Sequence, residues 1–219
     1  MKIGYIVDIH GSVGKLEKIL KKFEENGVEF IIVGGDVTDF GTLDEAIRIL
    51  RSIRDNSNRN IYFVPGNCDD TKLLEWEGAK KIHNIHKKIY KANEIEIVGL
   101  GGSLITPFHT NIEFSEEEIR EILKSFNIKS EFLFVTHSPP HGCKLDRAFK
   151  IKHVGSKEIR KFIQEKKPLV VLTGHIHESS GVDKIGESVI VNPGPASKGR
   201  YAVIEIDENK NIKAIIEKA

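Results

Sequence analysis

IGYIVDIH, residues 3–10, is the first of five stretches that share one pattern; the others are EFIIVGGDVTD (29–39), IYFVPGNCD (61–69), EFLFVTH (131–137) and LVVLTGHIH (169–177). Each begins with an apolar, largely β-branched run and ends in residues that can bind a metal ion. A short apolar run of this kind predicts a buried strand. The pattern therefore predicts five strands that bring Asp, His and Asn to one edge of a sheet, which favours a metal site.

Amphipathic helices are predicted between these strands. Apolar residues recur three and four positions apart after three capping residues, Ser12, Thr42 and Ser115, and in a fourth helix expected to begin at about Ser156. Glu45 and Glu118 stand three positions after two of these caps, which is the pattern of a capping box. Gly27 is expected to end the first helix, and the last helix is expected to reach about Glu165.

The last third of the chain has a different pattern. Residues 182–185, 188–191, 202–206 and 212–216 read as short strands separated by Gly, Pro, Asn and Asp turns. Strand–helix alternation followed by such a meander predicts two packed sheets with helices outside, in a single domain over residues 1–219.

The composition indicates a globular protein without a specialised surface. The chain has 33 basic and 32 acidic residues, a net charge of +1, so its charge gives no case for a nucleic-acid or membrane partner. The first strand leaves no room for a signal peptide, and Cys68 and Cys143 do not make a disulfide framework; we therefore expect a cytoplasmic location. Abundant Lys and Glu with scarce Met fit either a thermophile or an AT-rich genome.

The polar residues at the predicted strand ends can be assigned metal-binding roles. On an extended chain Asp8 and His10 point the same way, so one ion can take both, and the same geometry puts His175 and His177 on one side of their segment. Asp36 can bridge two ions. With Asn67 and His137 the set has seven members, too many for one four-coordinate ion and suitable for two ions that also bind water.

In this order, the motifs Asp8-Ile-His10, Gly35-Asp36-Val-Thr-Asp39, Gly66-Asn67-Cys68-Asp69, His137 and Gly174-His175-Ile-His177 resemble those of the calcineurin-like metallophosphoesterases. The resemblance spans residues 8–177. It implies an α/β fold, a four-layer α/β/β/α sandwich of two mixed sheets flanked by helices. It also implies one ion on Asp8, His10, Asp36 and His177, a second on Asp36, Asn67, His137 and His175, and a bridging hydroxide that attacks phosphorus.

Two departures from the family pattern bear on the substrate. Cys68 stands where the family usually has a His that is thought to protonate the leaving group, and Pro65 stands where its protein phosphatases have an Arg. The Gly-Asn-Cys-Asp variant resembles the small phosphodiesterases of the family. We therefore expect a phosphodiesterase; the alternatives are a phosphomonoesterase or nucleotide phosphatase, and a metal-binding interaction scaffold on the same fold.

Further residues near the motifs have open roles. Asp39 and Asp69 are expected to orient a ligand imidazole or amide, or else to be ordinary turn residues. Five residues are candidates for substrate binding, each with a structural or surface role as the alternative: Cys68, His141, Arg147, Asn192 and Arg200.

The expected cofactors are two divalent ions. The donor set suits manganese, iron, zinc, nickel or cobalt, and we favour manganese. The expected partner is a small phosphoester, and a homodimer is possible.

Overall fold

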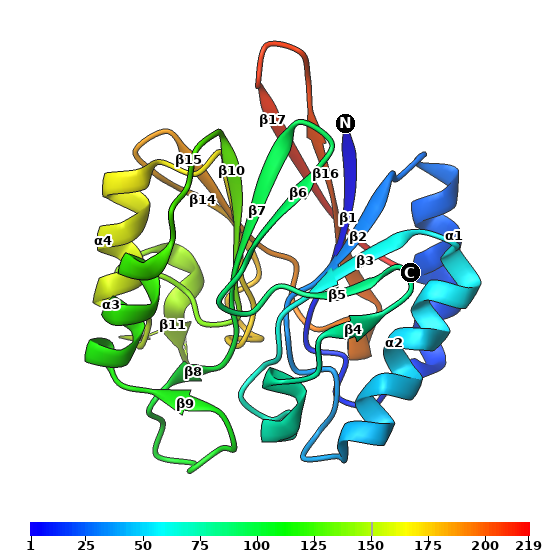
Figure 1. Ribbon diagram of the computed structural model, residues 1–219, viewed down its shortest axis with the longest axis horizontal. Coiled ribbons are helices and arrows are strands. Elements are labelled where there is room, and N and C mark those ends of the chain that lie inside the picture. Colours follow the sequence, from blue (N-terminus) through cyan, green and yellow to red (C-terminus); the bar gives the residue numbers. More distant parts are fainter. Residues whose placement is uncertain (150) are drawn as a thin grey trace.

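The computed structural model describes residues 1–149 and 151–219. Its chain forms four layers, helix–sheet–sheet–helix, with the two sheets packed face to face (Figure 1). This is the predicted four-layer α/β/β/α sandwich of two mixed sheets. None of the described helices has the length and apolarity that a membrane span requires.

The first sheet has the strand order β17-β16-β1-β2-β3-β5-β4. Its four central strands are parallel: β1 (Lys2–Ile6), β2 (Phe30–Val33), β3 (Asn60–Phe63) and β5 (Ile82–Asn84). Antiparallel strands complete both edges: β4 (Gly78–Ala79), β16 (Arg200–Ile206) and β17 (Ile212–Lys218).

The second sheet has the order β14-β15-β13-β10-β7-β6. Its parallel strands are β7 (Ile95–Leu100), β10 (Phe132–Thr136), β13 (Val170–Leu172) and β15 (Ser188–Asn192). Antiparallel β6 (Ile89–Ala92) and β14 (Gly181–Ile185) lie at its edges. Two small ribbons lie outside the sheets: β8 (Ser103–Leu104) with β9 (Glu113–Phe114), and β11 (Arg147–Ala148) with β12 (Lys152–His153).

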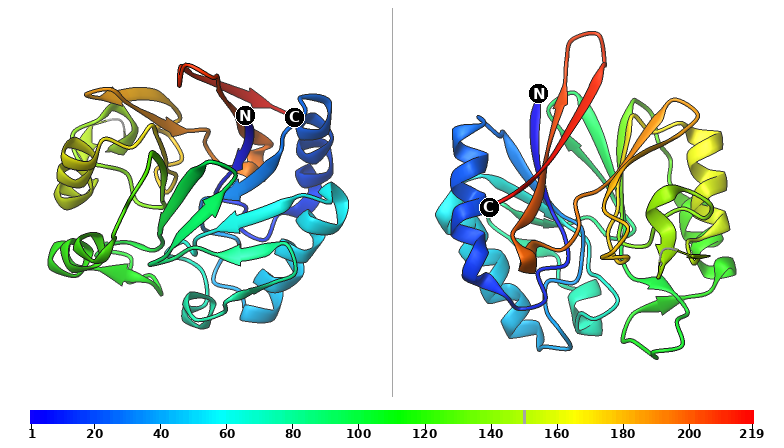
Figure 2. Two further views of the ribbon diagram at one scale, coloured as in Figure 1. Left: turned by 45° about the horizontal axis from the view of Figure 1, so that its top comes forward. Right: turned by 180° about the vertical axis from the view of Figure 1, so that it is seen from behind.

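Three apolar layers hold these elements together. Helices α1 (Leu16–Glu25) and α2 (Leu43–Ser57) cover the outer face of the first sheet, and α3 (Glu116–Ser125) and α4 (Lys157–Lys166) cover the second (Figure 2). Alternate side chains of the central strands pack into different apolar layers, as β2 illustrates. Ile31 and Val33 face the helices, while Phe30 and Ile32 face the other sheet.

The helix starts agree with the capping prediction at two of three positions, and Ser156, the expected start of the last helix, is also a cap. The side chains of Thr42, Ser115 and Ser156 each accept a backbone hydrogen bond at the start of α2, α3 or α4, and Ser115 with Glu118 forms the full capping box. The prediction for Ser12 was wrong: its side chain makes no cap bond. A 3₁₀ turn over Val13–Lys15 precedes α1 instead, so the helix begins at Leu16.

The prediction that all five motif-bearing strands end at one edge of one sheet was also wrong. β1, β2 and β3 belong to the first sheet, and β10 and β13 to the second. Because apolar runs alone do not specify which strands pair, the division was not visible in the sequence. The register aligns the carboxyl ends of β1, β2 and β3 within the first sheet, because Ile6 pairs with Val33, and Val33 with Phe63.

The candidate metal centre

The candidate ligands lie in loops that leave the strands with unusual backbone conformations. Asp8, His10, Asp36 and His175 all have positive φ, between 47° and 65°. Non-glycine residues adopt this left-handed region rarely and at a cost of about 1–3 kcal/mol, and such residues cluster at functional sites. The expectation of an extended chain at Asp8–His10 and His175–His177 was therefore wrong. Asp8 and His10 still come together, as expected, but turns and not strands aim their side chains.

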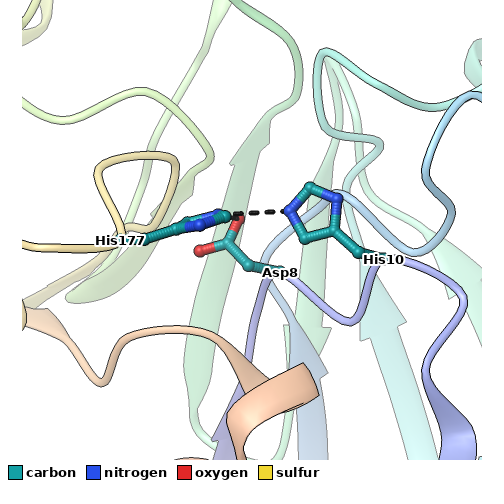
Figure 3. A group of neighbouring side chains, drawn as sticks. All are labelled: Asp8, His10 and His177. Carbon is teal, nitrogen blue, oxygen red and sulfur yellow. Dashed lines mark hydrogen bonds and ion pairs between the residues drawn. The ribbon is translucent and has the colours of Figure 1, made fainter.

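Asp8, His10 and His177 form what we call the outer half-site (Figure 3). The Nε2 atoms of His10 and His177 lie 3.1 Å apart, and His177 Nε2 is 3.7 Å from Asp8 Oδ1. Asp8 is fully buried, whereas the His10 and His177 side chains are 18% and 38% exposed. This half-site therefore opens toward solvent.

Asn67 and His137 form the inner half-site. His137 Nε2 lies 2.9 Å from Asn67 Oδ1, and both residues are buried. His175 lies beside them, with its ring centroid 5.3 Å from that of His137. The structure thus brings His177, but not His175, into the outer half-site, although the two are two residues apart in the chain.

Asp36 lies between the two half-sites. Its Oδ2 atom is 3.7 Å from His10 Nε2 and 3.4 Å from His137 Nε2. Its Oδ1 atom accepts a hydrogen bond from the backbone N–H of Cys68 at 2.8 Å, which fixes the carboxylate. One carboxylate oxygen therefore faces an imidazole from each half-site, as a bridging ligand must.

Several atoms in this cluster have no suitable protein partner. The Oδ2 atom of Asp8 is buried and makes no hydrogen bond. His137 Nδ1 lies 2.9 Å from the Gly34 carbonyl oxygen, which can only accept, so in the neutral ring Nε2 turns a lone pair toward Asn67 Oδ1. Buried acceptors without donors are costly, and a cation satisfies them. The residues present therefore fit divalent metal ions.

The charges at the inner half-site are strongly coupled. Burial lowers the pKa of His137, but the Asp36 carboxylate outweighs burial and raises it to about 9. Burial opposes ionisation of Asp36, yet His137 and then His10 hold its pKa well below the usual range. Burial and the neighbouring His137 lower the pKa of His175 to about 4. Without a metal, a proton on His137 compensates the Asp36 charge; a metal ion can take that place.

Asp69 supports the site through backbone contacts. Its buried carboxylate accepts hydrogen bonds from the N–H groups of Val37, Thr38 and Gly66, at 2.8–3.1 Å, and from the Thr38 hydroxyl. It therefore ties the Asp36 loop to the Asn67 loop and touches no ligand imidazole or amide, contrary to the expected role. Burial and Asp36 raise its pKa to about 6.

Gly66 is required where these two loops meet. A Cβ atom at this position would lie 2.1 Å from both the N and the Oδ1 atoms of Asp36. Only glycine allows the backbone to approach the proposed bridge so closely.

Asp39 and Cys68 lie beside the outer half-site and Asp36. Asp39 Oδ1 is 3.6 Å from His10 Nδ1, on the far side of the ring from His177, so the exposed carboxylate can orient that imidazole. The Cys68 Sγ atom lies within 4.8 Å of ligand atoms of both His10 and Asp36. Burial and Asp36 raise the pKa of this thiol.

Asn192 and Arg200 have structural contacts instead of free polar groups. Asn192 is buried; its amide donates to the carbonyl oxygens of Ile176 and Ser179, and its Oδ1 accepts from Gly194 N. It thus pins the His175–His177 loop. Arg200 donates to the Pro193 carbonyl oxygen at 2.6 Å and to the Ser180 hydroxyl at 2.7 Å. These contacts argue against the substrate-binding roles expected for both residues.

His141 and Arg147 flank a buried carboxylate that sequence reasoning missed. Asp146 Oδ1 accepts from His153 Nδ1 at 2.5 Å, and its Oδ2 accepts from the backbone N–H groups of Gly142 and Gly155. His141 Nδ1 is 3.7 Å from the same oxygen, while the Arg147 side chain is exposed. Asp146 therefore organises the β11–β12 ribbon, and nothing in its local sequence distinguishes it from a surface Asp.

Comparisons with known proteins identify relatives of this chain and structures of the same fold. An uncharacterised protein of Methanocaldococcus jannaschii is 39% identical over 215 residues, which cover 95% of this chain and 94% of the relative. An archaeal phosphodiesterase structure superposes with a TM-score of 0.56 at 18% identity, covering 99% of this chain and 100% of the other. A dimetal phosphatase from Danio rerio superposes with a TM-score of 0.67 at 13% identity, covering 95% and 93%.

At these identities the two structures show the common fold alone, and the family rests on the sequence itself. Residues 1–179 match the family described as calcineurin-like phosphoesterase, a stretch that contains every residue of both half-sites. The chain belongs to the calcineurin-like phosphoesterase family.

Proposed function

We propose that this protein is a phosphodiesterase that uses two divalent metal ions. The observation that carries the proposal is the position of Asp36, whose Oδ2 atom faces His10 on one side and His137 on the other. Asp8, His10, Asp36 and His177 would hold one ion, and Asp36, Asn67, His137 and His175 the other. When bound, such a pair activates water as a nucleophile and stabilises charge on the phosphoryl oxygens.

The chain's own residues prepare the site for an anionic substrate. Asp8 and Asp36 contribute two negative charges against the four positive charges of two ions, so a net positive charge remains for a phosphate ester. Asp69 and Gly66 hold the Asp36 and Asn67 loops in contact. Gly34 O fixes the His137 ring, and Asp39 faces the far nitrogen of His10. These contacts preorganise the donors, so little rearrangement is needed when an ion binds.

The surroundings of the site favour a diester over a monoester. A monoester dianion needs an extra positive partner, typically Arg or Lys. Among the described residues, the ion pairs recorded for Asp8 and Asp36 are all with histidines. Arg200 is committed to Pro193 and Ser180, and Arg147 belongs to an outer ribbon. A diester monoanion can be neutralised by the ions alone. The fold does not decide the question, because it occurs in both a phosphodiesterase and a dimetal phosphatase.

Cys68 bears on the leaving group. Its Sγ atom is near the half-sites but offers no imidazole, so protonation of a poor leaving group has less help. We therefore expect nitrophenyl diesters to be cleaved far faster than dialkyl diesters. Manganese is the ion that we expect to support activity best, because the carboxylate, amide and imidazole donors suit it.

Matched substrates test the proposal. Methyl p-nitrophenyl phosphate and p-nitrophenyl phosphate have the same leaving group and differ in charge. After reconstitution with manganese, kcat/KM should be about tenfold or more higher for the diester, which corresponds to about 1.4 kcal/mol. A monoester preference would contradict the diester assignment and would make Arg147 the first residue to replace. Metal binding without turnover of either ester would instead favour an interaction scaffold.

A further inference from the structure

Exposed apolar side chains lie on loops and ribbons that are joined to the loops of the candidate metal centre. Among the described residues, seven large apolar side chains are exposed: Val13, Phe40, Ile105, Phe108, Phe149, Ile151 and Val182. Single exposed apolar residues are ordinary, but a set confined to one region is not. Apart from Val182, each lies in a loop or ribbon that continues from, or is bonded to, a ligand-bearing loop. We call Phe40, Ile105, Phe108, Phe149 and Ile151 the apolar rim.

Phe40 lies on the side of the site formed by the first sheet. It directly follows the Asp36–Asp39 motif, and its backbone N–H donates to the Cys68 carbonyl oxygen at 3.1 Å. Its φ is 55°, and its side chain is 56% exposed. More than half of this phenyl group therefore faces solvent, on a left-handed residue joined to both ligand loops.

Ile105 and Phe108 lie at the tip of the β8–β9 connection, which is bonded to the Asn67 loop. Gly102 N donates to the Pro65 carbonyl oxygen at 2.9 Å, and Ile112 N donates to the Asn67 carbonyl oxygen at 3.1 Å. The tip side chains are 67% and 74% exposed. The two anchors therefore hold the base of this connection beside the Asn67 loop.

Phe149 and Ile151 lie at the tip of the β11–β12 ribbon, which is bonded to the loop that carries His177. Phe149 N donates to Glu178 Oε1 at 2.7 Å, and the Ser179 hydroxyl donates to the Arg147 carbonyl oxygen at 2.8 Å. Phe149 and Ile151 are 80% and 84% exposed. β8, β9 and β11 lie in the lower half of Figure 1, where the loops that follow β1 and β2 also run.

The β11–β12 ribbon has basic residues beside its apolar side chains, whereas acidic Asp39 precedes Phe40 and Glu178 accepts from Phe149 N. The ribbon sequence from Arg147 is RAFKIKH, with no acidic residue, and Arg147 and Lys152 are exposed. The ions would take the phosphate, and the apolar tips suit a hydrocarbon group attached to it. The same chemistry fits a phosphodiester with an apolar arm, whose phosphate would lie at the ions while the arm extends over the rim.

We propose that the site takes phosphodiesters with an apolar arm, such as an alkyl or acyl-bearing alcohol, and that the apolar rim binds that arm. This inference rests on the proposed phosphodiesterase function and names its substrate class. It assigns specificity to Phe149, Ile151, Phe108 and Phe40, which lie outside the metal-binding motifs.

The test is a series of alkyl p-nitrophenyl phosphates with methyl, butyl and octyl arms. Full burial of one methylene is worth about 0.8 kcal/mol, or about fourfold in affinity; an open rim covers only part of each, so we expect kcat/KM to rise at least about tenfold from methyl to octyl. The variant F149N/I151S should lose most of that rise and lose less activity on the methyl ester. Asparagine is chosen because it tolerates the positive φ of 52° at Phe149. Val182→Ser, an exposed apolar residue on β14, is the matched control and should keep the full rise.

A binding measurement separates this inference from the proposed function. Calorimetry should show methyl octyl phosphate binding at least about tenfold tighter than dimethyl phosphate, and F149N/I151S should abolish the difference. Turnover that is insensitive to arm length would overturn the rim proposal and leave the phosphodiesterase standing. Arm-dependent binding without turnover of any diester would contradict the phosphodiesterase and leave the rim proposal standing. A dimer that dissociates in F149N/I151S would show that the rim is an interface between copies and would also overturn the proposal.

Discussion

The two half-sites share Asp36 but differ in their surroundings. The inner one, Asn67 and His137, is closed, and both side chains are buried. Asp69 holds the Asn67 loop, and the Gly34 carbonyl oxygen holds the His137 ring. The outer one has a buried carboxylate, Asp8, but its imidazoles are partly exposed. The two half-sites offer similar donor atoms in different environments, so their affinities for metal ions should differ. Burial slows the exchange of an ion with solvent, and preorganised donors bind the ion more tightly. The inner ion should therefore be the structural anchor and the outer ion the exchangeable one.

Asp36→Asn should have the largest effect, because it removes the contact that the half-sites share. The amide cannot bridge two cations as a carboxylate does, so both ions should be lost and diester turnover should fall by about 10⁴-fold or more. Metal analysis after gel filtration and steady-state kinetics would measure both. Asp44→Asn, on the first turn of α2, is the control and should change neither. An Asp36→Asn protein that keeps two ions would contradict the bridging role of Asp36.

Asp69→Ala should lower the free energy of unfolding by about 3–5 kcal/mol, since it leaves buried N–H groups of two loops without an acceptor. Denaturant unfolding of the metal-free protein would measure the loss. Asp70→Ala is a matched control: its carboxylate also accepts backbone bonds, from Leu43 and Lys72, but at a partly exposed position, so about 1 kcal/mol is expected. Equal losses for the two variants would show that Asp69 is an ordinary turn residue.

His177→Ala sharpens the comparison, because it empties the exposed half-site and leaves the closed one intact. We expect about one ion per chain and a decrease in turnover of about 10²–10³-fold, since one Lewis acid is lost. Metal analysis and kinetics in parallel would detect it. His83→Ala, at a histidine stacked on Tyr62 and remote from the motifs, should leave both values unchanged. Loss of both ions from His177→Ala would contradict the proposed independence of the inner half-site.

Asp39→Ala should have the smallest effect. Asp39 faces His10 across 3.6 Å, but its side chain is 65% exposed, so water can replace most of what it does. A decrease of about tenfold in affinity for the second, weaker ion is expected, with the first unchanged, in a metal titration. A decrease in the affinity of the first, tighter ion would contradict the assignment of Asp39 to the outer half-site.

From the sequence we could predict the family, the four layers and most helix starts, because these follow from the local pattern and from the order of the motifs. Ser115 with Glu118 is an example in which local preference and structure agree. It did not predict that Asp69 and Asn192 bond to backbone, since their partners come from loops brought together only by strand pairing. The same holds for Arg200, whose partners lie on the loop that leads from β15 toward β16 and on the loop that carries His177.

The positive φ values of Asp8, His10, Asp36 and His175 were also not predictable from residue type. Asp and His are not glycine, and their local preference is for ordinary backbone. The conformation is held by hydrogen bonds between the loops that follow the neighbouring strands β1 and β2, such as Asp8 N to the Gly35 carbonyl oxygen at 3.1 Å and His10 N to the Asp36 carbonyl oxygen at 2.9 Å. Local strain of this kind is retained where function requires it.

The most direct test of the central claim is a crystal structure of the manganese-loaded protein, with anomalous diffraction to locate the ions. The account predicts two peaks about 3.5–4 Å apart, both within bonding distance of Asp36, with the inner peak at the higher occupancy. Limited chelation before data collection should remove the outer peak first. A single fully occupied ion, or two ions that do not share Asp36, would contradict the account.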